Sequence, residues 1–345
     1  MCGIVGLYLK KSNLCDQIGE LFSTMLVCLS SRGPDSAGFA IYGNEPPAGY
    51  IKVTLRHDGG NYDWQSLSDE LSQHFKCQPQ LHTNSNYAVI AVSAQETEIR
   101  RVLQDLDASV SVMSVGRSIE ILKEIGSPQS IVERFSMRSM RGSHAIGHTR
   151  MATESAVTTD GSHPFSTGMD LCLVHNGSLS NHNRLRRILQ RYGIEIRTEN
   201  DSEVAAGYLM WQMQQGKSLQ QALEAALEDL DGFYTFAIGT AEGFAVLRDP
   251  IACKPAVLAE TADFVAMASE FQALADLPGI DQTIGDVYLC FGGTSMETIN
   301  NSNRIEGKML KGSETNTTRK FAFTSPNIHS NLGSSLGQFG SCAAV

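Results

Sequence analysis

The chain has 345 residues, of which 42% are hydrophobic and 19% are charged, as is typical of a soluble globular protein. No basic block offsets the formal net charge of −10, which argues against nucleic acid as the main partner. No apolar run approaches the ~18 residues that a membrane helix needs, so the sequence also argues against a membrane.

The cysteines and the N-terminus indicate the compartment. The eight cysteines are scattered and form no C-x-x-C pair, a pattern that predicts reduced thiols rather than a disulfide framework or a zinc ribbon. The apolar N-terminus has neither a basic leader nor a cleavage site, so we expect no signal peptide. Together these features predict a cytoplasmic protein.

The first six residues, from Met1 to Gly6, predict a buried strand, because the apolar Ile4 and Val5 stand between glycines. The small side chain at position 2 favours removal of the initiator methionine, which leaves Cys2 with both a thiol and a free α-amine. An α-amine titrates near ~7.7–8.0 and a thiol near ~8.5, so the amine is a base close to its own sulfur. Two interpretations stay open: a catalytic Cys2, or an ordinary first strand that contains a cysteine.

A helix and a second strand follow. Asp16 is placed to cap a helix whose apolar residues recur at intervals of three and one, and Gly33 and Pro34 end this helix. The apolar face consists of Ile18, Leu21, Phe22, Met25, Leu26 and Leu29. Residues 38–42 then predict a strand.

Residues 44–142 have a different pattern, in which strands alternate with amphipathic helices. The strands are predicted at residues 50–56, 87–93 and 110–115, and the helices at residues 63–75 and 96–106. This alternation predicts a small α/β subdomain inserted into the main fold. It contains no motif that we associate with chemistry.

The main pattern resumes with strands at residues 144–150 and 171–174. The second strand runs into His175-Asn176-Gly177, which local propensity predicts to be a tight turn. The helices that follow are predicted at residues 180–192, from about Asp201, and after the capping box of Ser218 and Gln221.

Antiparallel strands and a polar extension complete the chain. Strands are predicted at residues 233–239, 244–248, 256–259, 264–268 and 287–291, the first four as two hairpins. Helices between blocks of antiparallel strands predict two stacked sheets with helices outside, in one domain of residues 1–291. Residues 292–345 are rich in Ser, Asn, Thr and Gly and predict a polar C-terminal extension, either a loose tail or a segment that something holds in place.

Four further stretches carry polar residues that suit chemistry in combination with Cys2. They are residues 32–38 at a helix-to-strand corner, 148–153 at a strand end, 175–177 after a strand, and 199–203 at the start of a helix. His144 and His148 are four residues apart and suggest a metal pair, but residues four apart in a strand are distant, so we favour structural histidines. We therefore expect no metal site, and neither a P-loop nor a dinucleotide-binding fingerprint occurs.

Together with Cys2, these stretches resemble the class II glutamine amidotransferases, whose glutaminase domain uses an N-terminal nucleophile. The resemblance covers residues 1–43 and about 142–291, and the motifs occur in the family's order. It implies an α+β fold, the four-layer αββα Ntn-hydrolase sandwich of two antiparallel sheets, with residues 44–142 as the inserted α/β subdomain. Met151 and Glu154 stand where some relatives have an aromatic residue and a histidine.

The resemblance also implies catalytic roles. Cys2 attacks the side-chain amide of L-glutamine, while the side chain of Asn176 and the backbone N–H of Gly177 form the oxyanion hole. Arg150 binds the α-carboxylate, and Asp201 holds the α-ammonium group. An amino acid held at both ends presents its amide to the nucleophile in one orientation.

Four more residues receive supporting roles from the same resemblance. Thr153, His175 and Ser178 belong to the substrate pocket, and Arg32 braces the strand of the nucleophile. Taken singly, each motif also has a structural interpretation: an ion pair for Arg150, an N-cap for Asp201 and a turn for Asn176-Gly177.

Three stretches narrow the resemblance further. Residues 147–159, 175–182 and 248–255 closely resemble the stand-alone glutamate-synthase-like amidotransferase subunits, a group that includes the small subunit of N-methylglutamate synthase. This implies a hetero-oligomer with glutamate-synthase-like subunits, in which FMN and an iron–sulfur cluster belong to the partner and no cofactor belongs to this chain. The residues after the last predicted strand are too few for a synthase domain, so we expect a separate subunit to use the nitrogen.

Two functions follow from these observations. The first is an active glutaminase that passes nitrogen to its partner in N-methylglutamate or glutamate synthesis. The alternative is a non-hydrolysing scaffold or regulatory subunit of the same complex, which binds glutamine or glutamate and retains Met1. The state of residue 1 separates them, because a retained Met1 acylates the α-amine of Cys2.

Overall fold

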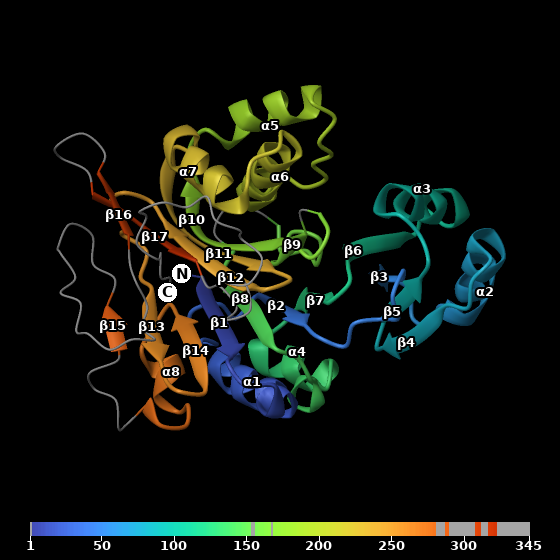
Figure 1. The fold of residues 1–345 in the computed structure, drawn as a ribbon, viewed down its shortest axis with the longest axis horizontal. Helices are drawn as coiled ribbons and strands as arrows, with labels where there is room; N and C mark the ends of the chain where they lie inside the picture. The colour runs from blue at the N-terminus through green and yellow to red at the C-terminus, as the bar shows by residue number, and fades with distance from the viewer. Residues whose placement is uncertain are drawn as a thin grey trace, which may run out of the picture.

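The structure, a computed structural model, describes residues 2–152, 156–166 and 168–280, together with the backbone of strands at 287–289, 308–311 and 317–322. The strands form two large antiparallel sheets and one smaller sheet, with helices packed on their outer faces (Figure 1). Among these residues, no helix is long and apolar enough to cross a membrane.

Strand β1 lies in the middle of a seven-stranded sheet, where both of its neighbours run antiparallel to it. Across the sheet, the order is β15 (Val287–Leu289), β13 (Val257–Glu260), β14 (Phe264–Ala268), β1 (Gly3–Leu9), β8 (His144–Arg150), β2 (Ser36–Tyr42) and β7 (Ile119–Ile125). Gly6 lets the second large sheet approach β1 closely, because a Cβ there would lie 2.8 Å from the ring of Phe244.

The second large sheet has six strands and contains the hairpin that the sequence predicts at residues 233–248. Its order is β16 (Lys308–Lys311), β17 (Thr317–Ala322), β12 (Gly243–Arg248), β11 (Gly232–Thr240), β10 (Cys172–Leu179) and β9 (Phe165–Ser166). Strands β16 and β17 belong to the polar extension, where the sequence predicts no strand. Strand β17 pairs with β12, so part of this extension completes the sheet.

Buried apolar residues fill the space between the two large sheets. Ile4 and Ile146 of the seven-stranded sheet and Val174 and Phe244 of the six-stranded sheet share one cluster. A second cluster joins the seven-stranded sheet to helices α1 (Ile18–Cys28), α4 (Pro128–Arg134) and α8 (Gln272–Ala275). A third joins the six-stranded sheet to helices α5 (His182–Arg191), α6 (Asp201–Gln214) and α7 (Leu219–Asp229). In Figure 1 the two groups of helices lie on opposite sides of the pair of sheets.

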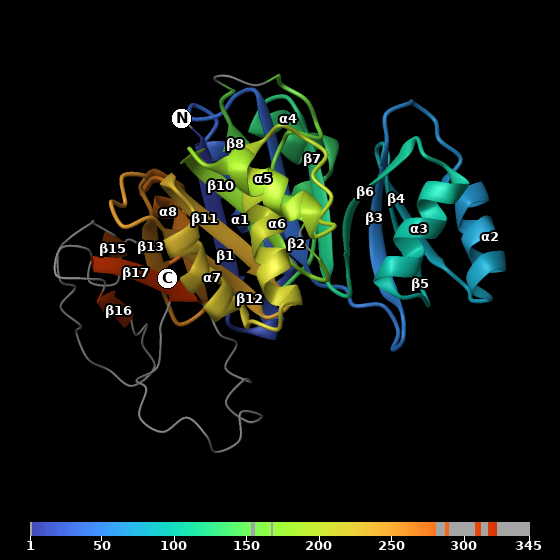
Figure 2. The ribbon, with the colours of Figure 1, turned by 90° about the horizontal axis from the view of Figure 1, so that it is seen from above.

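The smaller sheet forms a separate unit beside the main body (Figure 2). Its order is β4 (Gln80–Asn84), β5 (Tyr87–Val92), β3 (Ile51–His57) and β6 (Val110–Gly116), and helices α2 (Trp64–Phe75) and α3 (Glu96–Leu106) cover one face. This separate sheet ends at Gly116, because β7 pairs with β2 in the seven-stranded sheet. The chain therefore returns to the main fold well before residue 142, where the sequence puts the boundary.

The sequence predicts the starts of α2 and α7 correctly, but not the start of α1. Asp63 caps α2 through the N–H of Ser66 (3.0 Å), and α7 begins after the predicted capping box. Asp16 does not cap α1, because it lies inside the 3₁₀ helix η1 (Ser12–Gln17) and α1 begins directly after it. A second 3₁₀ helix, η2 (Met137–Ser139), follows α4.

Candidate active site

Cys2 lies directly before β1, and its side chain is half-buried. Its Sγ is 3.8 Å from the carbonyl oxygen of Met151, the distance of a weak S–H···O contact. Nε of Arg32 donates to the carbonyl oxygen of Cys2 (3.0 Å), and Nη1 of Arg32 pairs with Glu270 (2.6 Å). Arg32 thus ties the backbone of Cys2 to the segment after β14.

Arg150 is the last residue of β8, and only 5% of it is exposed. Its Nη1 donates to the carbonyl oxygen of Ala156 (3.3 Å). The corner before β2 supports this strand end, because the N–H of Asp35 donates to the carbonyl oxygen of Arg150 (3.1 Å). Gly33 in the same corner packs directly on β8, where a Cβ would lie 2.2 Å from the carbonyl carbon of Thr149. A side chain at this position would push the corner away from Arg150.

Asn176 and Gly177 lie within β10, where they pair with Thr235 and Tyr234 of β11. The prediction of a tight turn was therefore wrong, since this pairing continues to the end of β10. Asn176 is 2% exposed, and its Nδ2 has no hydrogen-bond partner among the residues that the structure describes. Gly177 has φ +150°, and a Cβ would lie 2.0 Å from the carbonyl oxygen of Phe233. A buried amide donor of this kind suits an oxyanion.

Strand pairing and one hydrogen bond bring the predicted residues together. The start of β1 lies beside the end of β8, because the two strands are antiparallel. From β8, Nε2 of His148 reaches the carbonyl oxygen of His175 in β10 (2.9 Å). Asn176 follows His175 directly, and Arg150 lies two residues after His148 on the same face of β8. Cys2, Arg150 and Asn176 are therefore at the same end of the two stacked sheets.

His175 and Asp201 connect β10 to the start of α6. Nδ1 of His175 is 2.9 Å from Oγ of Ser202 and 3.6 Å from Oδ1 of Asp201, whose Oδ2 accepts from the N–H of Leu179 (2.9 Å). Burial acts to raise the pKa of Asp201, but its interactions with His175 and with the N–H of Leu179 outweigh burial and lower the pKa to about 2. Asp201 is therefore a carboxylate at neutral pH, with acceptor capacity for an ammonium group.

Asn200 links the start of α6 to the surroundings of Arg150. The N-cap of α6 is Asn200 and not Asp201, because the Asn200 side chain accepts a hydrogen bond at the helix start (2.9 Å). Nδ2 of Asn200 also donates to the carbonyl oxygen of Gly161 (3.0 Å), and a Cβ on Gly161 would lie 3.5 Å from Nη1 of Arg150. Gly161 thus lies between Arg150 and Asn200, the residue before Asp201. Arg150 and Asp201 are the predicted ligands for the two ends of an amino acid.

The remaining predicted pocket residues are Thr153, His175 and Ser178, and the last two differ in how exposed they are. Ser178 is exposed and pairs with Phe233 of β11. His175 is buried, with its ring against Phe236, so it supports the site from the helix side of β10. Thr153 lies outside the described residues.

Two buried residues at this end were not predicted from the sequence. His163 stacks on His148 with ring centroids 4.0 Å apart, and neither ring nitrogen of His163 has a hydrogen-bond partner in the described part of the chain. Burial lowers the pKa of His148 to about 3 and the pKa of Lys123 to about 8. Nζ of Lys123 donates to three carbonyl oxygens, those of Asp160, Ser162 and Pro164. The alternating apolar residues around Lys123 are the sequence signal that marks its strand.

The two histidines of β8 do not face each other. Nε2 of His144 is 2.8 Å from the carbonyl oxygen of Thr240, whereas Nε2 of His148 faces His175. Both contacts fit the structural interpretation of these histidines. Within the described residues, no group of three or more His, Cys, Asp or Glu side chains is arranged to hold a metal ion.

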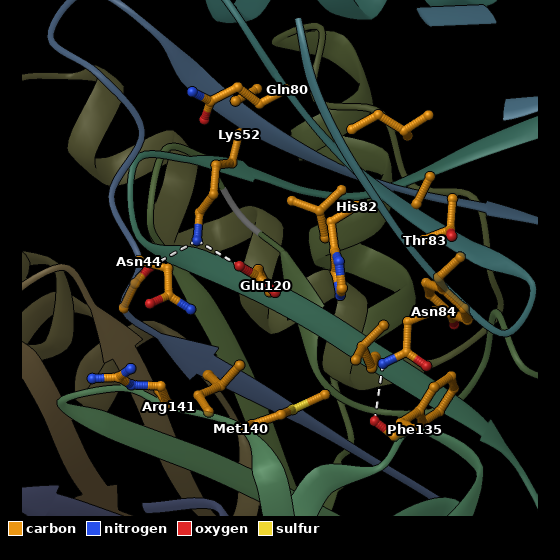
Figure 3. A pocket seen from close by; sticks show the side chains of 18 of the residues that line it. Asn44, Lys52, Gln80, His82, Thr83, Asn84, Glu120, Phe135, Met140 and Arg141 are labelled. Atoms are coloured by element: carbon orange, nitrogen blue, oxygen red, sulfur yellow. Dashed lines mark hydrogen bonds and ion pairs between the residues drawn. The ribbon is translucent and has the colours of Figure 1, made fainter. Parts of the chain in front are cut away.

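A cavity of about 570 Å³ lies elsewhere, between the smaller sheet and the seven-stranded sheet (Figure 3). Lys52 reaches into this junction from β3, and its Nζ bonds to the carbonyl oxygens of Gly43 and Ser118 and to Glu120. All three protons of the ammonium group are thereby used. None of the candidate site residues lines this cavity, so cavity size does not locate the chemistry in this protein.

Comparisons with known proteins agree with the motifs. The family model of the glutamine amidotransferase domain matches residues 148–276. The glutamine amidotransferase-like protein GlxB of Rhizobium meliloti is 55% identical over 282 residues, which cover 81% of this chain and 93% of that protein. A relative from Methanothermobacter thermautotrophicus is 33% identical over 80% of this chain and 94% of its own length.

A solved structure shows the same fold. The glutamine phosphoribosylpyrophosphate amidotransferase from B. subtilis matches with a TM-score of 0.51 at 19% identity, over 85% of this chain and 46% of that chain. This chain thus spans about half the length of that enzyme, and the likeness is one of fold: antiparallel sheets with helices packed on them. The chain matches two of these relatives over nearly their whole length. It therefore belongs to the glutamine amidotransferase family, as a class II enzyme.

Proposed function

We propose that this chain is the glutaminase subunit of a cytoplasmic hetero-oligomer, and that Cys2 hydrolyses the side-chain amide of L-glutamine after removal of Met1. The observation that carries the proposal is the position of Cys2, Arg150 and Asn176 at one end of the stacked sheets, where the Asn176 amide is buried. We assign the fold in full to the four-layer αββα sandwich of the Ntn hydrolases.

The proposed reaction proceeds in two steps. The thiol of Cys2 attacks the amide carbon of glutamine, a C–S bond forms, and the carbonyl electron pair moves to oxygen. The α-amine of Cys2 takes the thiol proton and passes it to the leaving nitrogen, so the C–N bond breaks and ammonia departs. Water then attacks the thioester, the C–S bond breaks, and glutamate leaves while the sulfur regains its proton.

Substrate grip in this proposal depends on Arg150 and Asp201. A planar guanidinium binds a carboxylate through two parallel hydrogen bonds, which the single ammonium of lysine cannot reproduce. We therefore expect Arg150→Lys to weaken glutamine binding by on the order of 2 kcal/mol, or about thirtyfold in KM. Steady-state kinetics of glutamine hydrolysis measure this effect.

A matched substitution separates this effect from a general loss of an arginine. Arg117 lies at the junction with the inserted unit, where its guanidinium pairs with Glu45 and donates to the carbonyl oxygen of Tyr50. Arg117→Lys should leave KM unchanged. A KM for Arg150→Lys within twofold of the wild type would mean that other residues hold the α-carboxylate.

The proposal extends to the acceptor of the nitrogen. We infer that ammonia passes to a glutamate-synthase-like subunit that carries FMN and an iron–sulfur cluster, in the synthesis of N-methylglutamate or glutamate. Support comes from the stretches at residues 147–159, 175–182 and 248–255, which resemble stand-alone amidotransferase subunits. Ammonia mixes with bulk water unless it is enclosed, so the pocket should open toward this partner. The inserted unit and the C-terminal extension are the surfaces that we assign to docking.

Co-expression with the products of neighbouring genes tests the partner. We expect a hetero-oligomer in size-exclusion chromatography that contains a flavin and an iron–sulfur subunit, and in which glutamine replaces ammonia as nitrogen donor. A monomer under these conditions would contradict the partner. Cys2-dependent glutaminase activity in that monomer would still support the hydrolysis reaction, so the two parts of the proposal are tested separately.

A further inference from the structure

His148 is a fully buried residue of β8 whose side chain crosses to the second large sheet. Its Nε2 lies 2.9 Å from the carbonyl oxygen of His175 in β10. A carbonyl oxygen can only accept, so Nε2 carries the proton of the ring and donates it. The other ring nitrogen has no hydrogen-bond partner in the described part of the chain. The interaction of His148 with β10 is therefore directional.

The accepting carbonyl belongs to the peptide that joins His175 to Asn176. The plane of this peptide fixes the N–H of Asn176, and with it the backbone from which the Asn176 side chain projects. From the opposite face of β10, the side chain of His175 bonds to Ser202 in α6 (2.9 Å). The segment before Gly177 is thus held from both faces, by β8 on one side and by α6 on the other.

Cys2 and Asn176, the nucleophile and the oxyanion donor of the proposed site, are held by different sheets. Cys2 precedes β1, in which Ile4 pairs with His148 of β8, whereas Asn176 lies in the facing sheet. The hydrophobic attraction between the sheets is itself non-directional. A hydrogen bond between them adds a directional constraint to this packing, and a displacement of 1 Å at a reacting centre can cost ~10²-fold in rate.

We propose that His148 is a positioning residue, which holds the amide of Asn176 in register with the sulfur of Cys2 through the carbonyl of His175. This inference rests on the proposed glutaminase function. His148 does not touch the substrate in this account. Its effect is on the distance and direction of the oxyanion donor.

His144 provides a matched comparison within the same strand. It lies four residues earlier on the same face, is fully buried, and its Nε2 is 2.8 Å from the carbonyl oxygen of Thr240. Thr240 is the last residue of β11, five residues after Thr235, which pairs with Asn176. His144 therefore makes the same kind of bond between the sheets, far from the oxyanion donor.

The test compares three variants in the full-length protein, His148→Leu, His144→Leu and His148→Gln. Leucine fills similar space without a donor, whereas the amide of glutamine places a donor near the position of Nε2. We expect His148→Leu to lower kcat for glutamine on the order of tenfold to a hundredfold, with KM changed less than twofold. His144→Leu should lower the unfolding midpoint comparably without changing kcat, and His148→Gln should restore most of kcat.

Hydrogen exchange gives a readout that does not depend on activity. Exchange of the Asn176 and Gly177 amides should accelerate in His148→Leu and not in His144→Leu. If His148→Leu does not fold, His148→Asn serves instead, because its amide is one methylene shorter than that of glutamine.

The outcomes separate the two proposals. An active wild type with equal kcat in His148→Leu and His144→Leu, or unchanged exchange at residues 176–177, would overturn the positioning role alone. A wild type without Cys2-dependent hydrolysis would overturn the proposed function, and with it the role of His148 in that function.

Discussion

Replacement of Cys2 by alanine is expected to abolish glutamine hydrolysis and to leave the fold intact. The thiol supplies the electron pair that forms the thioester, so we expect a loss on the order of 10⁴-fold or more in kcat. Stability should change little, because the Sγ contact with Met151 is long and Arg32 binds the backbone carbonyl of residue 2, which alanine keeps. Glutamate release and the thermal unfolding midpoint, measured on the same preparation, test both halves of this expectation.

Cys28→Ala is the control for this result. Cys28 is the last residue of α1 and is also half-buried, and burial raises the pKa of its thiol, which makes it a poor nucleophile. Its removal should leave hydrolysis unchanged. Undiminished hydrolysis in Cys2→Ala would remove Cys2 from the mechanism.

Asn176→Ala should give the second largest effect. Loss of one oxyanion donor typically costs ~10²–10³ in kcat, and KM should change little because the ground-state amide gains less from this donor. The described structure gives Nδ2 of Asn176 no hydrogen-bond partner, so its removal leaves no protein acceptor unsatisfied there. We therefore expect a stable variant with low kcat.

Asn84→Ala should show the opposite pattern. Asn84 lies at the cavity of Figure 3, and its Nδ2 donates to the carbonyl oxygen of Phe135 (2.9 Å). Loss of this bond should cost about 1 kcal/mol of stability without changing kcat. If Asn176→Ala instead lost stability and kept kcat, Asn176 would be a structural residue and the oxyanion would have another donor.

Much of the fold was predictable because its signals are local. The apolar spacing and the Asp63 cap define α2, and the capping box of Ser218 and Gln221 defines the start of α7. The hairpins β11–β12 and β13–β14 join neighbours in the sequence, so short turns reveal their pairing.

The predictions failed where distant pairing decides the structure. Strand β7 pairs with β2, so the residues after Gly116 belong to the main fold, although their alternation with helices resembles that of the inserted unit. Asn176-Gly177 has the composition of a turn, but the pairing of β10 with β11 keeps it in a strand. Strand β4 is the edge strand of the smaller sheet and has no buried residue, so it lacks an apolar pattern.

The candidate site was predictable from motifs only in part. The sequence motifs named Cys2, Arg150 and Asn176, but no spacing in the sequence shows that they meet at one end of two sheets. The contacts that hold the site together join distant segments, as with His148 and the carbonyl of His175, or Arg32 and that of Cys2. Such contacts depend on how distant segments pack against one another, which periodicity within each strand does not determine.

Intact-mass spectrometry of the native protein, before and after treatment with 6-diazo-5-oxo-L-norleucine, tests the central claim most directly. This glutamine-like electrophile reacts with a nucleophile that lies in a glutamine pocket. We predict a protein that lacks Met1 and gains one adduct, which peptide mapping assigns to Cys2. A protein that retains Met1, or an adduct on another cysteine, would contradict the account and favour the non-hydrolysing subunit.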